Sequence, residues 1–213
     1  MVIRHKIRIA ALAAITTLAS IAFAPPVRSQ SSTAPQYTAD GNLVTPTGFE
    51  TWVFVGSNLG LGYQKELPVT TAKESAQADT QVFHNIYINP EAYAYFREKH
   101  EFPELTMLVM EIFTAAGKEP KGVVTAGVYN DQRIGLQVAV KDSTHPSKPS
   151  NSPWAYYIPQ DWEDDAHHHP LLPSSKAFGS ASCESCHHDH ASMDHVWVQF
   201  YPTLRKLLPQ APR

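Results

Sequence analysis

The sequence predicts an α+β domain, in which a mainly antiparallel β-sheet packs against helices. The middle of the chain holds several short runs of β-branched and aromatic residues, each bounded by turn-forming residues. One clear helix start interrupts these runs, and the C-terminal part of the chain has helical character. The length leaves room for one domain with a substantial core.

Residues 1–29 are predicted to form a secretory signal peptide. Basic residues precede an apolar run over residues 9–24, and two prolines end that run. The run is shorter than the roughly 20 residues that a membrane-spanning helix needs, which disfavours an uncleaved anchor. We expect cleavage after Ala24 or Ser29, and a mature protein in the periplasm that does not span the membrane.

The remainder of the chain is expected to be a flexible lead-in followed by one folded domain. Residues 30–48 are rich in Ser, Thr, Pro and Gly, which is typical of a lead-in, and the domain is expected over residues 49–208. The net charge is −3 at pH 7, and removing the basic signal peptide makes the chain more acidic. This mildly acidic charge argues against a nucleic-acid partner, because a basic face supplies most of the affinity for nucleic acid.

The predicted elements follow from local patterns. A helix is expected from Pro90 to about Lys99, because Asn89 is a favourable N-cap, Pro90 suits the first helical position and Glu91 suits the first turn. The predicted strands are Trp52–Val55, Val82–Ile88, Met107–Phe113, Val123–Tyr129, Ile134–Val140 and Trp154–Ile158.

The chemistry of the sequence is concentrated in one short motif, Cys183-Glu184-Ser185-Cys186-His187. The chain has 2 cysteines, and both belong to this motif, which lies in a C-terminal segment predicted to be helical. A C-x-x-C-H sequence is the attachment signal for c-type haem. The two thiols add to the haem vinyl groups, and the adjacent histidine coordinates the iron. We therefore predict one covalent haem c, held by Cys183 and Cys186, with His187 as the iron ligand.

Other interpretations of this motif are disfavoured. A redox dithiol would need a thioredoxin-like context, which the predicted elements do not provide. A structural zinc site could recruit His188, His190 or His195, but such sites usually draw on a second, separated pair of ligands. A chance match can occur in any chain. These histidines and the tract 167–169 could also bind a surface metal, although solvated loop histidines are the simpler interpretation.

The side of the iron opposite His187 is predicted to be open. Met193 is too near His187 in the sequence to reach the opposite haem face if the helix continues. Met107 and Met110 lie in one predicted strand, and no methionine occupies the late loop position that would suggest a small electron carrier. An open iron site suits ligand binding or chemistry better than simple electron transfer.

Further motifs occur in a fixed order over roughly residues 49–204. They are Trp52–Gly56, Phe83–Tyr93, Phe102-Pro103 followed by Thr106–Glu111, Gly135–Asp142, and Asp194 through Pro202. Together with Cys183–His187, they make the chain resemble the cytochrome P-460 family, which includes the beta-type cytochromes c-prime. So many short matches in one order are more specific than the haem motif alone.

The resemblance implies a homodimer of mainly antiparallel sheet, with a five-coordinate haem whose distal side faces that sheet. In hydroxylamine-oxidising members a lysine is bonded to the haem ring, whereas the beta-type cytochromes c-prime lack that bond and bind nitric oxide and carbon monoxide. In this chain Met110 stands at the position of the cross-linking lysine and His84 at that of the distal arginine. Gln137 stands at the position of the distal glutamate, which serves in proton transfer.

Strand alternation gives two of these positions an interpretation of their own. Met110 shares a face with Leu108 and Ile112, so we expect a core or haem-contacting apolar residue. His84 lies on a face with apolar neighbours, where a histidine is usually a core residue but beneath a haem could be a distal hydrogen-bond donor.

Gln137 is the third distal candidate. The small residues Gly135 and Ala139 flank it on its face, and they are expected to leave room for a haem plane. Gln137 cannot take up a proton at neutral pH, but its amide can donate a hydrogen bond to an oxygen of a bound ligand.

The sequence leaves three functions open. The first is a haem protein that binds nitric oxide or another small nitrogen-oxide or diatomic ligand. The second is a hydroxylamine-oxidising enzyme, which Met110 and Gln137 argue against. The third is a periplasmic electron carrier with His84 or a methionine as the sixth ligand. A cytochrome is the redox partner we expect for such a protein.

Overall fold

The computed structural model describes residues 33–62, 82–118, 125–145, 152–160, 170–179 and 183–209. All of these residues belong to the unit Ser31–Arg213. The predicted signal peptide and the histidine tract 167–169 lie outside the described residues.

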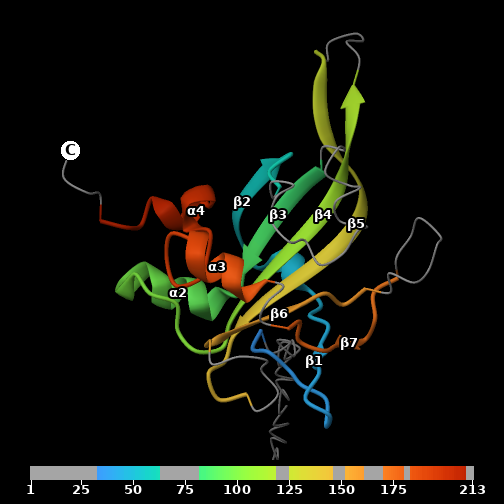
Figure 1. The fold of residues 1–213 in the computed structure, drawn as a ribbon. Helices are drawn as coiled ribbons and strands as arrows, with labels where there is room; N and C mark the ends of the chain where they lie inside the picture. The colour runs from blue at the N-terminus through green and yellow to red at the C-terminus, as the bar shows by residue number, and fades with distance from the viewer. Residues whose placement is uncertain are drawn as a thin grey trace, which may run out of the picture. The chain divides into compact units, whose positions relative to one another are not determined.

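The central element is a 5-stranded antiparallel sheet whose strands follow one another in chain order (Figure 1). With the helices that cover one of its faces, it confirms the predicted α+β class. The strands are β2 (Val53–Leu59), β3 (Val82–Ile88), β4 (Thr106–Lys118), β5 (Gly127–Lys141) and β6 (Trp154–Tyr157).

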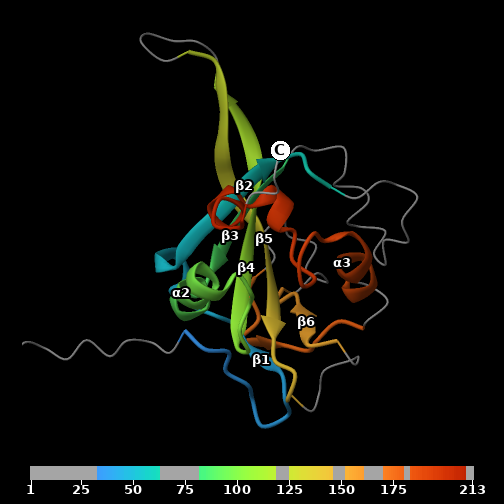
Figure 2. The same cartoon turned by 90° about the vertical axis from the view of Figure 1, so that its left-hand side faces the viewer.

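Strand β5 differs most from the prediction. Two separate strands were expected, Val123–Tyr129 and Ile134–Val140, but one strand runs from Gly127 to Lys141 and stays paired with β4. Between Ile112 and Ala115 of β4 the register shifts twice, and each shift passes one extra residue of β5, so the bulges lie in β5 between the two predicted halves. The outer ends of β4 and β5 form an arm that extends beyond the rest of the sheet (Figures 1 and 2).

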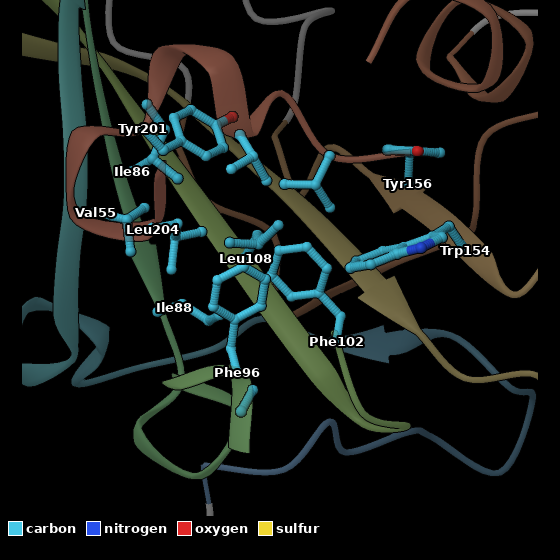
Figure 3. Packing of buried hydrophobic residues seen from close by; sticks show 13 residues of the cluster. Val55, Ile86, Ile88, Phe96, Phe102, Leu108, Trp154, Tyr156, Tyr201 and Leu204 are labelled. Carbon is cyan, nitrogen blue, oxygen red and sulfur yellow. The ribbon is translucent and has the colours of Figure 1, made fainter. Parts of the chain in front are cut away.

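One face of the sheet is covered by helices α2 (Pro90–Lys99), α3 (Glu184–His190) and α4 (Pro202–Arg205), with the 3-10 turn η2 (Val198–Phe200) between the last two (Figure 1). Within the described ranges, every helix is too short or too polar to cross a membrane. The buried side chains on this face form a cluster that we call the helix-side core (Figure 3). It contains Val55, Ile86, Ile88, Ala92, Phe96, Phe102, Leu108, Trp154, Tyr156, Val196, Val198, Tyr201 and Leu204.

A glycine allows the C-terminal segment to approach the sheet. A Cβ atom on Gly56 of β2 would lie 3.2 Å from the carbonyl oxygen of Phe200 and 3.3 Å from the Cα of Tyr201. The backbone before α4 therefore packs directly on β2, which closes the helix-side core at that edge of the sheet.

The helix α2 has the predicted bounds, but Asn89 does not cap it with its side chain. Its Oδ1 accepts a hydrogen bond from the backbone N–H of Met107 at 2.8 Å, and its Nδ2 donates to the carbonyl of Leu105 at 3.3 Å. The side chain therefore ties the start of the helix to β4, and this tertiary contact replaces the expected local one.

The opposite face of the sheet packs against the N-terminal segment. Strand β1 (Leu43–Val44) pairs with β7 (Ser174–Ser175) in a 2-stranded sheet, and the 3-10 turn η1 (Phe49–Thr51) follows. Leu43 is 1% exposed and packs, with Phe49, against side chains of β4 and β5. The prediction of a flexible lead-in is therefore wrong for Leu43 and its neighbours, because burial of this side chain orders them.

Candidate haem site

The cysteine motif forms the first turn of α3. Cys183 is the N-cap residue, and the backbone N–H of His187 donates to its carbonyl at 3.1 Å. Both cysteines are partly exposed thiols. Cys183 packs against the helix-side core. Burial, followed by the charge of Asp189, raises the pKa of the Cys186 thiol, which is neutral at pH 7.

The imidazole of His187 is fixed by a hydrogen bond from its Nδ1. This nitrogen lies 2.8 Å from the carbonyl oxygen of His195, which can only accept, so the contact assigns the ring proton to Nδ1. The lone pair then belongs to Nε2. Burial lowers the pKa of His187 below its ordinary value of 6.5, which keeps the ring neutral at pH 7. A neutral imidazole with a free Nε2 lone pair is the form that binds a metal.

Two aromatic rings surround the imidazole of His187. The ring of Tyr156 on β6 lies 4.5 Å from it between centroids, and that of Trp197 lies 5.4 Å away. The indole Nε1 of Trp197 also donates a hydrogen bond to Nε2 of His187 at 3.2 Å. This indole must release Nε2 before a metal can bind there, because the nitrogen has one lone pair in the ring plane.

These residues fit a c-type haem. The two thiols lie one helical turn apart, with Cys183 against the helix-side core, and the next residue is a neutral histidine whose ring proton lies on Nδ1. Cys183 and Cys186 would hold the haem, and His187 would hold its iron. When bound, haem supplies an iron centre that binds small ligands and exchanges electrons.

The three distal candidates lie on the sheet face that α3 covers. Met110 of β4 is the register partner of Gln137 on β5, and its side chain packs against the helix-side core that also contacts Cys183. Two residues further along the same face, His84 of β3 is the register partner of Ile112 on β4, and Ile112 is the register partner of Gly135 on β5. The structure therefore brings all three positions together with the cysteine motif on one side of the sheet.

The space above Gly135 is filled by the protein itself. A Cβ atom on Gly135 would lie 2.9 Å from Cδ1 and 3.0 Å from Cβ of Ile112. The sequence predicted that this glycine leaves room for a haem plane. The structure corrects that interpretation, because Ile112 packs over Gly135 from the neighbouring strand.

His84 is held by an asparagine on β2. Its Nδ1 lies 3.0 Å from Oδ1 of Asn58, which accepts, so the contact assigns the ring proton to Nδ1 and the lone pair to Nε2. Burial lowers the pKa of His84, so the ring is neutral at pH 7. A neutral ring in this tautomer offers a proton acceptor at Nε2, whereas the sequence suggested a distal donor.

Two of the remaining histidines of the C-terminal segment, His188 and His195, lie with their ring centroids 5.2 Å apart. His188 is exposed beside Asp189, while Nδ1 of His195 lies 2.9 Å from Oε1 of Glu184 and both of these side chains are partly buried. Among the described residues, no group of three or more His, Cys, Asp and Glu side chains is arranged to hold a metal ion.

Two features of the site carry no sequence signal. The first is the hydrogen-bond acceptor of His187, which is a backbone carbonyl, a group that every residue has. The direction of this carbonyl depends on positive φ angles at Asp194 (43°) and His195 (61°). A left-handed residue other than glycine costs roughly 1–2 kcal/mol, and Asp and His enter this region more often than most other residues. Trp197 looks from the sequence like an ordinary core residue, and only the fold brings its indole to Nε2 of His187.

An antiparallel sheet with a C-x-x-C-H helix packed on one face defines a haem-binding domain of the cytochrome type. The family model described as Cytochrome P460 matches residues 46–198, and the chain belongs to the cytochrome P460 family. This membership confirms the resemblance seen in the sequence and implies a c-type haem cofactor. No curated protein matches the chain.

Proposed function

We propose that this protein is an exported cytochrome with one haem, attached covalently through Cys183 and Cys186 and ligated by His187. Its iron binds nitric oxide, or another small nitrogen-oxide or diatomic ligand, on the side facing the sheet. The tautomer of His187 and the placement of both thiols on one turn of α3 support this assignment.

The pairing of Met110 with Gln137 carries the choice of ligand binding over turnover. A thioether cannot form the amine bond to haem that the lysine of oxidising relatives forms. A carboxamide does not take up a proton at neutral pH, so Gln137 cannot act as the base that the distal glutamate provides. The two positions that oxidation needs are therefore changed together, on directly opposed residues of one sheet face.

Export and assembly follow from other features. The basic, apolar and small-residue pattern of residues 1–29 supports delivery to the periplasm. Family membership supports a homodimer, and a second cytochrome is the redox partner that an exposed haem protein of this kind would use.

Hydroxylamine oxidation is the second candidate, and the geometry of His84 favours it. Because Asn58 fixes the ring proton on Nδ1, Nε2 of His84 is a proton acceptor. The ordinary pKa of histidine lies near neutrality, and burial lowers that of His84 from this value. A positioned base contributes about 10²–10⁴-fold to such steps, so His84 could partly replace the missing carboxylate.

The test combines two measurements. Ligand uptake by the ferrous protein is followed in the optical spectrum, and hydroxylamine turnover is measured with an artificial electron acceptor. We expect a high-spin ferrous spectrum, uptake of carbon monoxide and nitric oxide, and little turnover. Met110→Lys/Gln137→Glu should gain turnover if the haem still attaches. Met110→Leu is the control for the loss of the thioether. Gln132→Glu is the control for the added negative charge of Gln137→Glu, because it places the same charge on the exposed part of β5.

Two results would contradict the proposal. Brisk turnover by the wild type would place hydroxylamine oxidation first and show that neither the lysine bond nor the carboxylate is needed. A sharp low-spin spectrum without uptake of carbon monoxide would favour an electron carrier. If that spectrum became high-spin in His84→Ala, His84 would be the sixth ligand.

A further inference from the structure

The carbonyl that accepts the His187 proton sits in a strained turn. Asp194 and His195 both have left-handed backbone angles, and the N–H of Val196 donates to the carbonyl of Met193 at 2.7 Å to close the turn. Asp and His enter this region more often than most residues do, but two such residues in succession still cost free energy, which surrounding contacts offset.

The carboxylate of Asp194 supplies those contacts. One oxygen lies 2.8 Å from Nζ of Lys141 in an ion pair, and the other accepts a hydrogen bond from the indole Nε1 of Trp154 at 3.2 Å. Lys141 and Trp154 are register partners on β5 and β6, so the carboxylate is tied to two adjacent strands. Nζ of Lys141 also donates to the carbonyl of Phe102 at 2.7 Å, and this second contact fixes the position of the ammonium group.

Lys141 and Trp154, which together anchor the carboxylate of Asp194, are packed in or beside the core of the domain. The Trp154 side chain is 1% exposed and packs in the helix-side core, with its ring edge-on to Phe102 (Figure 3). The side chains of Lys141 and Asp194 are 16% and 27% exposed, so the pair is shielded from solvent more than a surface ion pair is. The sheet therefore holds the turn through partners that are themselves fixed by packing.

We propose that Asp194 is a positioning residue for the axial histidine. Held by Lys141 and Trp154, it fixes the turn that aims the His195 carbonyl at the Nδ1–H of His187. A hydrogen bond at Nδ1 makes the imidazole a stronger donor to iron, which favours the ferric state and lowers the reduction potential. The inference rests on the proposed ligation by His187, and it adds three residues that act through that histidine.

The test measures the iron–histidine stretching band of the ferrous protein by resonance Raman spectroscopy, together with the reduction potential. We expect Asp194→Ala to lower the band frequency and raise the potential. Trp154→Phe keeps an aromatic ring in the core and removes the indole N–H together with part of the ring, so it should shift both readouts in the same direction by less. Asp189→Ala is the control, since it removes an exposed carboxylate from α3 itself.

Lys141→Met separates positioning from simple charge effects. Loss of a positive charge alone would lower the potential, whereas loss of the anchor raises it and lowers the band frequency. Lys141→Arg should keep both readouts close to those of the wild type.

The idea is overturned if all variants keep the wild-type band while their potentials follow only the sign of the charge removed. Failure of the proposed function would look different, because the wild type itself would then lack covalent haem or an iron–histidine band.

Discussion

Replacing Gly135 by alanine tests how tightly the sheet face is packed beside the distal positions. Gly135 lies next to Gln137 along the same face, and the added Cβ would come within 2.9–3.2 Å of three side-chain atoms of Ile112. One of those atoms is the Cβ of Ile112, which cannot move without the backbone of β4. The contact must therefore be relieved by a shift of the strand rather than by a side-chain rotation.

The expected cost follows from two opposing contributions. Overpacking a well-filled core typically costs 1–3 kcal/mol. Replacing glycine by alanine at a compatible position gains roughly 0.4–1 kcal/mol, because the unfolded chain loses freedom. We therefore expect Gly135→Ala to lower the free energy of unfolding by about 1–2 kcal/mol.

Gly117→Ala is the matched control, because a Cβ atom at Gly117 on β4 would meet nothing within 4 Å. It has the same entropic gain, so the difference between the two variants isolates the overpacking. Urea denaturation should show a lower midpoint for Gly135→Ala with an unchanged m-value. An Ile112→Ala background removes the Cδ1 and Cγ1 contacts and keeps the Cβ contact, so Gly135→Ala should cost less there but should still destabilise. Equal stability of Gly135→Ala and Gly117→Ala would refute the packing argument.

Three further outcomes are expected. In Cys183→Ala/Cys186→Ala the purified chain should carry no covalent haem, and haem staining that persists on a denaturing gel would contradict attachment through these thiols. The mature wild type should have the mass of its polypeptide plus one haem, and a loss of hydrogens beyond that would indicate a lysine bond despite Met110. Burial lowers the pKa of His84, so below the ordinary value of 6.5 the unfolded chain binds a proton that the folded protein does not. The free energy of unfolding should therefore fall as pH falls from 6.5, and His84 contributes at most ~1.4 kcal/mol per pH unit to this fall. Between pH 7 and 5 the urea midpoint of His84→Asn should fall less steeply than that of the wild type. Parallel curves for the two proteins would exclude this contribution.

The strand pattern and the cysteine motif were accessible from the sequence because both depend on local order. Residues on β3 alternate between faces, so the spacing of Ile86 and Ile88 is enough to place them on one face. The same holds for the thiols of Cys183 and Cys186, whose spacing predicts one helical turn. Element ends were less accessible, as β5 shows, because pairing with β4 carries the strand through Asn130 and Asp131.

Contacts between distant segments were not accessible. Asn89 has the local signature of a helix cap, yet its side chain bonds to Leu105 and Met107, since those partners come within reach only when β4 is in place. Gly135 suggested free space, but Ile112 from the neighbouring strand fills it. A single sequence does not show which side chain of a partner strand lies above a small residue.

The sequence by itself determined the α+β class, the motif Cys183–His187 and the family to which the chain belongs, because each depends on the order of residues along the chain. Only the tertiary structure decided which nitrogen of His187 carries the proton, since its acceptor is the carbonyl of His195 in a left-handed turn. The same is true of Asp194, whose partners Lys141 and Trp154 lie on strands far away in the sequence. Hydrogen bonds at such separations exist only after the sheet has formed, and so the chain order alone does not reveal them.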